Sequence, residues 1–105
     1  MSIVAGNTTT STPTMATATS VTVLAANAFR KFLLIQNNSA ADIAISLEGA
    51  ALTGIAPTST NKCFVLKSTA GLNIVRFDGD FIPAGAITAY QTSGSPINTL
   101  VVIEG

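Results

Sequence analysis

The sequence predicts an all-β fold: a single β-sandwich of seven or eight short strands, either a jelly roll or an immunoglobulin-like Greek key, with an extended N-terminal arm. From Thr17 onward, short apolar runs alternate with clusters of Gly, Pro, Asn and Ser at a spacing of roughly eight to twelve residues, which is typical of sandwiches and barrels. No segment shows the 3.6-residue apolar period of a helix. We therefore expect an arm over residues 1–16 and a sandwich over residues 17–105.

The expected arm is rich in hydroxyl side chains. The first twenty residues contain ten Ser or Thr and no charge. Thr is β-branched and favours extended backbone, whereas a terminus that is not held by other elements frays. Disordered segments normally carry more charge than this one, which favours an arm laid along a neighbouring subunit. Ile3, Val4 and Met15 are its large apolar side chains, and we expect them to contact that partner.

Three strands are expected in the first half of the sandwich. Val21 and Val23 alternate with Thr22 in the first, and residues 43–47 alternate apolar and small or polar side chains in the third, up to Gly49. Residues 30–36 form the second.

The second expected strand is apolar on both faces. Leu33 and Ile35 point to one side, and Phe32 and Leu34 to the other. Such a strand is covered twice, by its own core and by either the arm or another subunit. We expect both Leu34 and, in the third strand, Ile45 to be interior.

The second half of the chain begins after a low-charge loop over residues 50–61, and it again shows short apolar runs separated by turn residues. Residues 63–67 and 72–77 flank a four-residue connector, which suggests a hairpin. The remaining extended segments are a short piece at residues 81–82, then residues 86–91 and residues 97–104.

The chain has few charges for the size of the surface that it would expose as a folded monomer. Five basic and five acidic residues give a net charge of zero, and charged residues make up 10% of the chain, where about 25% is usual. A folded monomer of this size exposes about 5,500 Å². Together with a mean hydropathy of +0.53, this predicts that part of the surface is hidden against other subunits.

The composition argues against most chemistry. With no His, no Trp and a single Cys, the chain has no His-based triad, no His-ligated metal site and no disulfide, so we expect no enzyme, no cofactor, no metal and no small-molecule substrate. The five Lys and Arg residues are scattered along the chain, which argues against a nucleic-acid partner. No apolar run approaches the ~20 residues that span a bilayer, and no secretory signal pattern begins the chain, so we expect no membrane partner.

Several single residues have two interpretations. Cys63 lies in an apolar run and is expected to be a buried small hydrophobe. Asp78 and Asp80 resemble a fragment of a calcium loop, but two carboxylates are few for that ion, and a corner between strands is the better interpretation.

Three further residues are candidate partner contacts. Arg30 and Lys31 could meet an acidic partner or lie solvated at a strand end. Tyr90, the only Tyr, could anchor an interface or pack in the core with its hydroxyl satisfied.

Two blocks of sequence resemble a known family. VLAAN at residues 23–27, RKFLLIQNNS at residues 30–39 and Asp42-Ile43 resemble a block found in small structural proteins of tailed bacteriophages. PAGAITAY at residues 83–90 and VVIEG at residues 101–105 resemble the end of the same proteins, so that the similarity covers roughly half of the chain. The resemblance implies a virion-associated β-sandwich, commonly a trimer, and brings no catalytic or cofactor residues.

The expected function is therefore that of a capsid decoration (cement) protein. Its expected partners are other copies of itself in a homotrimer and the phage major capsid protein, and its expected location is the outer capsid surface of the virion after synthesis in the host bacterial cytoplasm. The alternative is a receptor- or carbohydrate-binding or structural module of a phage fibre, tail or collar. With no Trp and one Tyr, the chain offers few aromatic rings for stacking on sugars.

Overall fold

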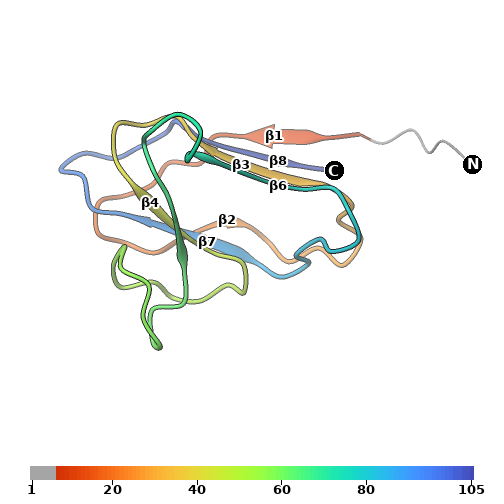
Figure 1. Cartoon of the computed structure of the whole chain (residues 1–105), viewed down its shortest axis with the longest axis horizontal. Coiled ribbons are helices and arrows are strands. Elements are labelled where there is room, and N and C mark those ends of the chain that lie inside the picture. Colours follow the sequence, from red (N-terminus) through yellow and green to blue (C-terminus); the bar gives the residue numbers. More distant parts are fainter. Residues whose placement is uncertain (1–6) are drawn as a thin grey trace, which may run out of the picture.

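A computed structural model describes residues 7–105, and within them the chain forms eight strands in two antiparallel sheets packed face to face (Figure 1). One sheet has the order β1-β8-β3-β6 and the other β2-β7-β4-β5. The strands are β1 (Thr9–Ser11), β2 (Val21–Leu24), β3 (Leu33–Asn37), β4 (Ile43–Ser46), β5 (Phe64–Leu66), β6 (Ile74–Phe77), β7 (Ile87–Gln91) and β8 (Leu100–Glu104). The all-β sandwich expected from the sequence is confirmed.

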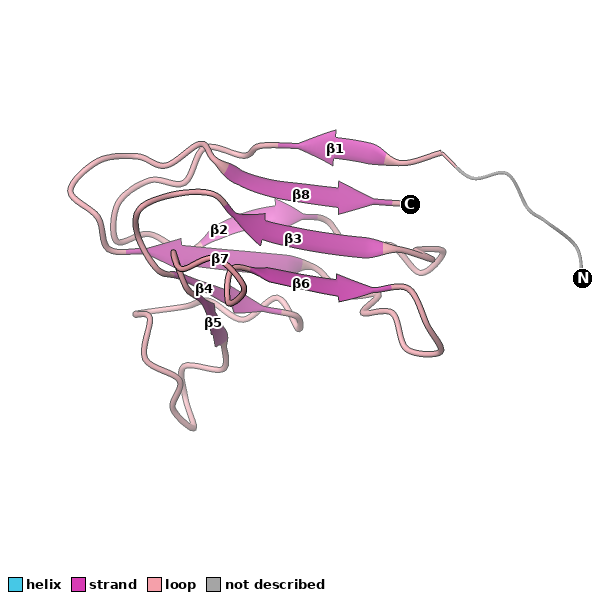
Figure 2. Cartoon of the chain, turned by 45° about the horizontal axis from the view of Figure 1, so that its top comes forward, coloured by secondary structure: helices cyan, strands magenta, loops and turns pink. Residues whose placement is uncertain are grey.

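The strands pair in a nested series that identifies the topology. β1 pairs with β8, β2 with β7, β3 with β6, and β4 with β5, as in one long hairpin that has been rolled up. The pairs β3·β8 and β4·β7 then join these units into two sheets (Figure 2). Eight strands in two sheets with this pairing form a jelly roll, which decides between the two topologies that the sequence left open.

The core lies between the sheets and takes alternate residues from each strand. In β3, Leu33 and Ile35 are fully buried, whereas Leu34 and Gln36 on the opposite face are only partly buried. Ile45 is interior as expected, but the expectation that Leu34 is interior is wrong, because the period of two places it on the outer face. The core cluster consists of Met15, Val23, Leu33, Ile35, Ile43, Ile45, Leu66, Ile87, Ala89, Ile97, Leu100 and Val102.

Part of the segment expected to be an arm belongs to the sandwich. β1 pairs with β8 in a register that runs from Thr9↔Glu104 to Ser11↔Val102. Met15 is fully buried, and its N–H donates to the carbonyl of Ile97 at 2.7 Å. The boundary expected after residue 16 is therefore wrong for residues 9–16. An edge strand is held by backbone hydrogen bonds, so β1 needs none of the apolar side chains whose absence suggested an arm.

The hairpin expected around residues 68–71 is also absent. A turn does form, since the N–H of Lys67 donates to the carbonyl of Leu72 at 3.0 Å. The flanking strands then diverge, because β5 pairs with β4 and β6 pairs with β3 in the other sheet. Both strands carry inward apolar side chains, and the jelly roll places them on opposite sides of one core.

The long loop between β4 and β5 covers the outer face of the β2-β7-β4-β5 sheet. Ala44 and Tyr90 on that face pack with Leu52 from the loop in a second, smaller apolar cluster. The Thr88 hydroxyl fixes the loop by donating to the carbonyl of Ala50 at 2.6 Å. The central strands β4 and β7 of this sheet are thus buried on both faces by their own chain.

Candidate interaction surfaces

The outer face of the β1-β8-β3-β6 sheet carries four apolar side chains among polar ones, and in Figure 1 no strand or loop of residues 7–105 lies above it. Antiparallel partners point to the same side of a sheet, so the register aligns two rows of side chains across this face. One row runs across Arg76, Leu34, Ile103 and Thr10, and the next across Ile74, Gln36 and Val101. Leu34, Val101 and Ile103 are partly buried, while Ile74 is 46% exposed.

We call this surface the outer sheet face. Its structure confirms one expectation from the sequence and contradicts another. The strand with apolar residues on both sides is confirmed for β3, with Phe32 and Leu34 on its outer side. The described part of the expected arm, however, lies at the sheet edge beside β8 and not across β3. Residues 7–16 therefore do not cover the outer sheet face.

Charge on the outer sheet face lies at its β6 edge. The Arg76 guanidinium is 2.6 Å from an Asp78 carboxylate oxygen and 5.8 Å from the centre of the Phe32 ring. Asp78 is thus paired with Arg76 at a strand corner. Within the described residues no group of three or more acidic, His or Cys side chains is arranged to hold a metal ion.

Arg30 lies at one end of the sandwich and is buried, so neither interpretation offered for it from the sequence is correct. Its side chain is 0% exposed, and its Nε donates to Glu104 Oε1 at 2.9 Å. The terminal nitrogens donate to the carbonyls of Ala25 at 2.9 Å and Gly85 at 3.1 Å, and to that of Pro83. Arg30 therefore joins β8 to the β2–β3 and β6–β7 loops.

Phe29 stands next to this junction and points outward. Its side chain is 87% exposed, the highest value among the exposed large apolar residues of the described chain. The turn that carries it is fixed, because Asn27 Oδ1 accepts the Phe29 N–H at 3.0 Å and Asn27 Nδ2 donates to Glu104 Oε1 at 2.8 Å. The Asn27 N–H also donates to the carbonyl of Ala84 at 2.8 Å, which ties the turn to the β6–β7 loop.

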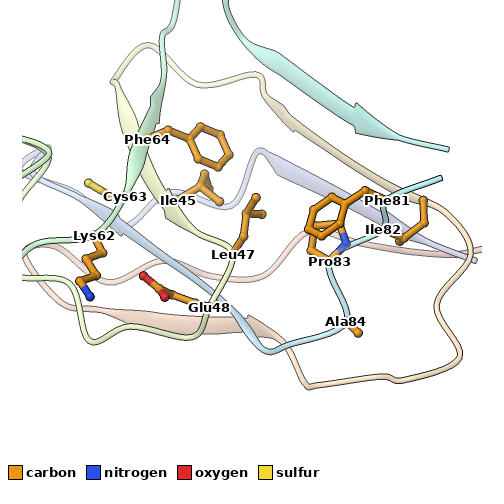
Figure 3. A pocket seen from close by; sticks show the side chains of 10 residues that line it. All are labelled: Ile45, Leu47, Glu48, Lys62, Cys63, Phe64, Phe81, Ile82, Pro83 and Ala84. Atoms are coloured by element: carbon orange, nitrogen blue, oxygen red, sulfur yellow. The ribbon is translucent and has the colours of Figure 1, made fainter. Parts of the chain in front are cut away.

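A groove of about 540 Å³ opens at the same end, between the β4–β5 side and the β6–β7 loop (Figure 3). Most of its wall is apolar, and Phe81 on its β6–β7 side is 69% exposed. Phe81 packs edge-to-face on Phe77, with ring centres 6.3 Å apart. The groove is lined by Ile45, Leu47, Glu48, Lys62, Cys63, Phe64, Phe81, Ile82, Pro83 and Ala84.

Cys63 lies on this groove and is only partly buried, so the expectation of a buried small hydrophobe is wrong. Removal from water disfavours the thiolate, and burial raises the pKa of the Cys63 thiol. A raised pKa leaves less thiolate at neutral pH, so Cys63 is not an activated nucleophile, and as the one Cys it has no disulfide partner within the chain.

Of the remaining predicted contact residues, the fold exposes some and buries others. Lys31 is exposed, as a partner contact requires. Tyr90 is 8% exposed and Met15 is fully buried, so both pack inside the protein. Ile3 and Val4 lie outside the described residues.

Sequence reasoning missed Phe29 and Phe81 as surface residues. The available signal was their position: Phe29 lies between two predicted strands, and Phe81 lies in the two-residue extended piece at residues 81–82, between the turn segments DGD and PAG. A large aromatic side chain in a turn, away from any alternating run, has no strand to carry it into the core.

Together the fold and these surfaces define a jelly-roll module with an apolar groove at one end and one sheet face, carrying apolar side chains, that no part of residues 7–105 covers. Comparison with protein-family models, curated proteins and solved structures found no match for the chain. Among residues 7–105 no helix is long and apolar enough to cross a membrane.

Proposed function

We propose that the chain is a non-enzymatic structural protein of a tailed-phage virion: a capsid decoration protein that binds the outer surface of the head and stabilises junctions between major capsid subunits. Its copies associate as a homotrimer. The protein acts by covering a surface, and the outer sheet face is the part that docks.

The observation that carries this proposal is the difference between the two sheets. The β4–β5 loop buries the outer face of one sheet, whereas the outer sheet face leaves Leu34, Val101 and Ile103 partly open and Ile74 46% exposed. Removing apolar surface from water contributes about 25 cal/mol per Å². A flat apolar sheet face that no part of residues 7–105 covers is therefore suited to a protein partner.

Two further properties support a role in adhesion. The chain has ten charged residues, of which Arg30 is buried, for 5986 Å² of accessible surface, so few charges need to be desolvated when a large area is covered. No buried side-chain polar atom of the described residues lacks a hydrogen-bond partner, which favours a rigid module that loses little entropy on docking. The assignment to a phage rests on the resemblance over about residues 21–48 and 83–105.

The test is binding of the purified protein to heads of the parent phage assembled without it, measured by cosedimentation. We expect Leu34→Asp to weaken binding by about 30-fold or more, as for an interface hot spot. Ser59→Asp, in the exposed part of the β4–β5 loop, is the matched control and is expected to bind like the unmodified protein.

Equal binding of the Leu34→Asp variant and the control would show that the outer sheet face does not dock. Binding to purified tails and not to heads would overturn the decoration role in favour of a tail or fibre module.

A further inference from the structure

The end of the sandwich carries both an exposed aromatic side chain and an apolar groove, and neither belongs to the outer sheet face. We infer that Phe29 of one copy inserts into the groove of a second copy. This contact joins copies of the chain and is independent of the capsid surface. Only the number of copies, three, rests on the proposed function.

Phe29 has the properties of an anchor residue. Its ring is 87% exposed, so it does not fill the groove of its own chain. Its turn is fixed by Asn27 and by the fully buried side chain of Arg30, which bonds β8 and two loops. Because the turn is already held in one conformation, binding through Phe29 costs little conformational entropy.

The groove has the properties of a receptor for such a ring. Its volume of about 540 Å³ is bounded by apolar side chains, with Leu47 and Phe64 on one wall and Phe81 and Ile82 on the other (Figure 3). Phe64 and Phe81 provide aromatic surfaces, and aromatic pairs gain attraction beyond the area that they bury. An apolar anchor in an apolar pocket is the arrangement typical of interface hot spots.

The charges around these two features are complementary. Lys31 follows the anchor turn, and two carboxylates, Glu48 and Asp80, lie at or beside the groove with one cation, Lys62. Among residues 7–105 the ion pairs are Arg30–Glu104, Lys67–Asp42 and Arg76–Asp78, which leaves these four charges without one. Docking therefore brings a net positive turn to a net negative groove rim.

The placement of the two features allows a closed assembly. The Asn27 N–H donates to the carbonyl of Ala84, a groove residue, so anchor and groove are neighbours at the same end. Each copy can then give Phe29 to one neighbour and receive Phe29 from another around a rotation axis at that end. A head-to-tail contact that closes in this way produces a ring.

The experiment compares Phe29→Ser with Leu72→Ser in the full chain by sedimentation equilibrium. Leu72 is the matched control because it is also a highly exposed apolar residue, 62% exposed, but it lies in the β5–β6 loop at the opposite end of the sandwich. We expect Phe29→Ser to raise the dissociation constant between copies by about 30-fold or more, and Leu72→Ser to change it less than about threefold. Both residues are exposed, so both variants should fold, and circular dichroism melting checks this.

Cys63 supplies a second readout at the groove itself. It is the only cysteine and lines the groove, so its maleimide labelling rate reports whether the groove is occupied. We expect severalfold slower labelling in the assembled protein than in the Phe29→Ser variant at the same pH. Unmodified protein that stays monomeric, a Phe29→Ser variant that assembles like the unmodified protein, or assembly without protection of Cys63 would each overturn the inference. An assembly of two copies with Cys63 protected would support the contact and contradict the trimer.

Discussion

The side chain of Arg30 joins two loops to β8 at one end of the sandwich. Its guanidinium has five N–H donors in a fixed plane, and four hydrogen bonds link it to one carboxylate and three backbone carbonyls. A buried guanidinium is stable only when its donors are satisfied in this way. The partners come from the β2–β3 loop, the β6–β7 loop and β8.

We expect Arg30→Met to lower the free energy of unfolding by about 3 kcal/mol or more, because it leaves Glu104 without its cation and three carbonyls without a donor. Met retains much of the apolar volume of the Arg stem. Lys31→Met is the control, since Lys31 is exposed and its replacement should change stability by less than about 0.5 kcal/mol. Urea denaturation measures both. Equal stability of the two variants would show that the bonds of Arg30 contribute nothing net to folding.

The role of Arg30 could not be predicted from the sequence. Glu104 lies 74 positions away and the carbonyl of Pro83 lies 53 positions away, so only the topology brings them together. Local sequence shows a charge at the start of a strand, and such charges are usually solvated. Cys63, by contrast, follows a loop and precedes a short strand, and its partial burial depends on how the β4–β5 loop packs against Ala44 and Tyr90.

At the scale of single strands, successive residues of β3 point to opposite faces of its sheet. Ile35 is fully buried between the sheets, and Leu34 beside it lies on the outer sheet face. Leu34 faces Arg76 and Ile103, whereas Ile35 faces Val75 and Val102 in the core. Neighbouring positions in one strand thus lie in the core and on the face that we propose to dock.

We expect Ile35→Asp to abolish the folded state and Leu34→Asp to leave it intact. A carboxylate at Ile35 would be buried without a partner, which costs several kcal/mol. At Leu34 the carboxylate can reach water, and we expect a loss of about 1 kcal/mol, of the size of strand propensity differences. Circular dichroism melting at low protein concentration distinguishes the two. Loss of folding in both variants would place Leu34 in the core.

The sequence predicted an extended segment at or overlapping each of the strands β2 to β8, and it missed β1. Residues 43–47 show the clearest apolar alternation, and β4 lies within that range. β1 has only Thr and Ser, so its sequence carries no apolar signal, and its position is decided by the free edge of β8. The connection between β5 and β6 resembled a hairpin because the turn depends only on neighbouring residues. The sheet that each strand joins depends on partners far away in the sequence, which the turn does not reveal.

For the whole molecule, nested pairing brings the two ends of the described chain together. β8 lies between β1 and β3, and Lys31 and Phe32 donate their N–H groups to the carbonyl of Gly105 at 2.7 and 3.1 Å. The C-terminal residues are therefore central to one sheet, and β1 closes that sheet at its edge (Figure 2). Both topologies considered from the sequence use the same strand lengths and turns, so strand order had to come from the structure.

Because β1 completes the edge of this sheet, the domain includes β1 and does not begin after residue 16. Two truncations test this boundary. Removing residues 1–6 should leave the melting temperature within a few degrees, because residues 7–105 contain all eight strands. Removing residues 1–16 deletes β1 and the buried Met15. Loss of a buried Met side chain alone costs about 2–5 kcal/mol, so we expect the melting temperature to fall by at least about 10 °C.

Met15→Ala in the full chain separates the side chain from the strand. It should lower the melting temperature by part of this amount, because β1 keeps its hydrogen bonds to β8 while a cavity opens among the core residues. Differential scanning calorimetry of the three proteins measures the two contributions. A 17–105 protein that melts like the full chain would show that β1 and Met15 add no stability, and that the segment acts as an arm laid on the sandwich.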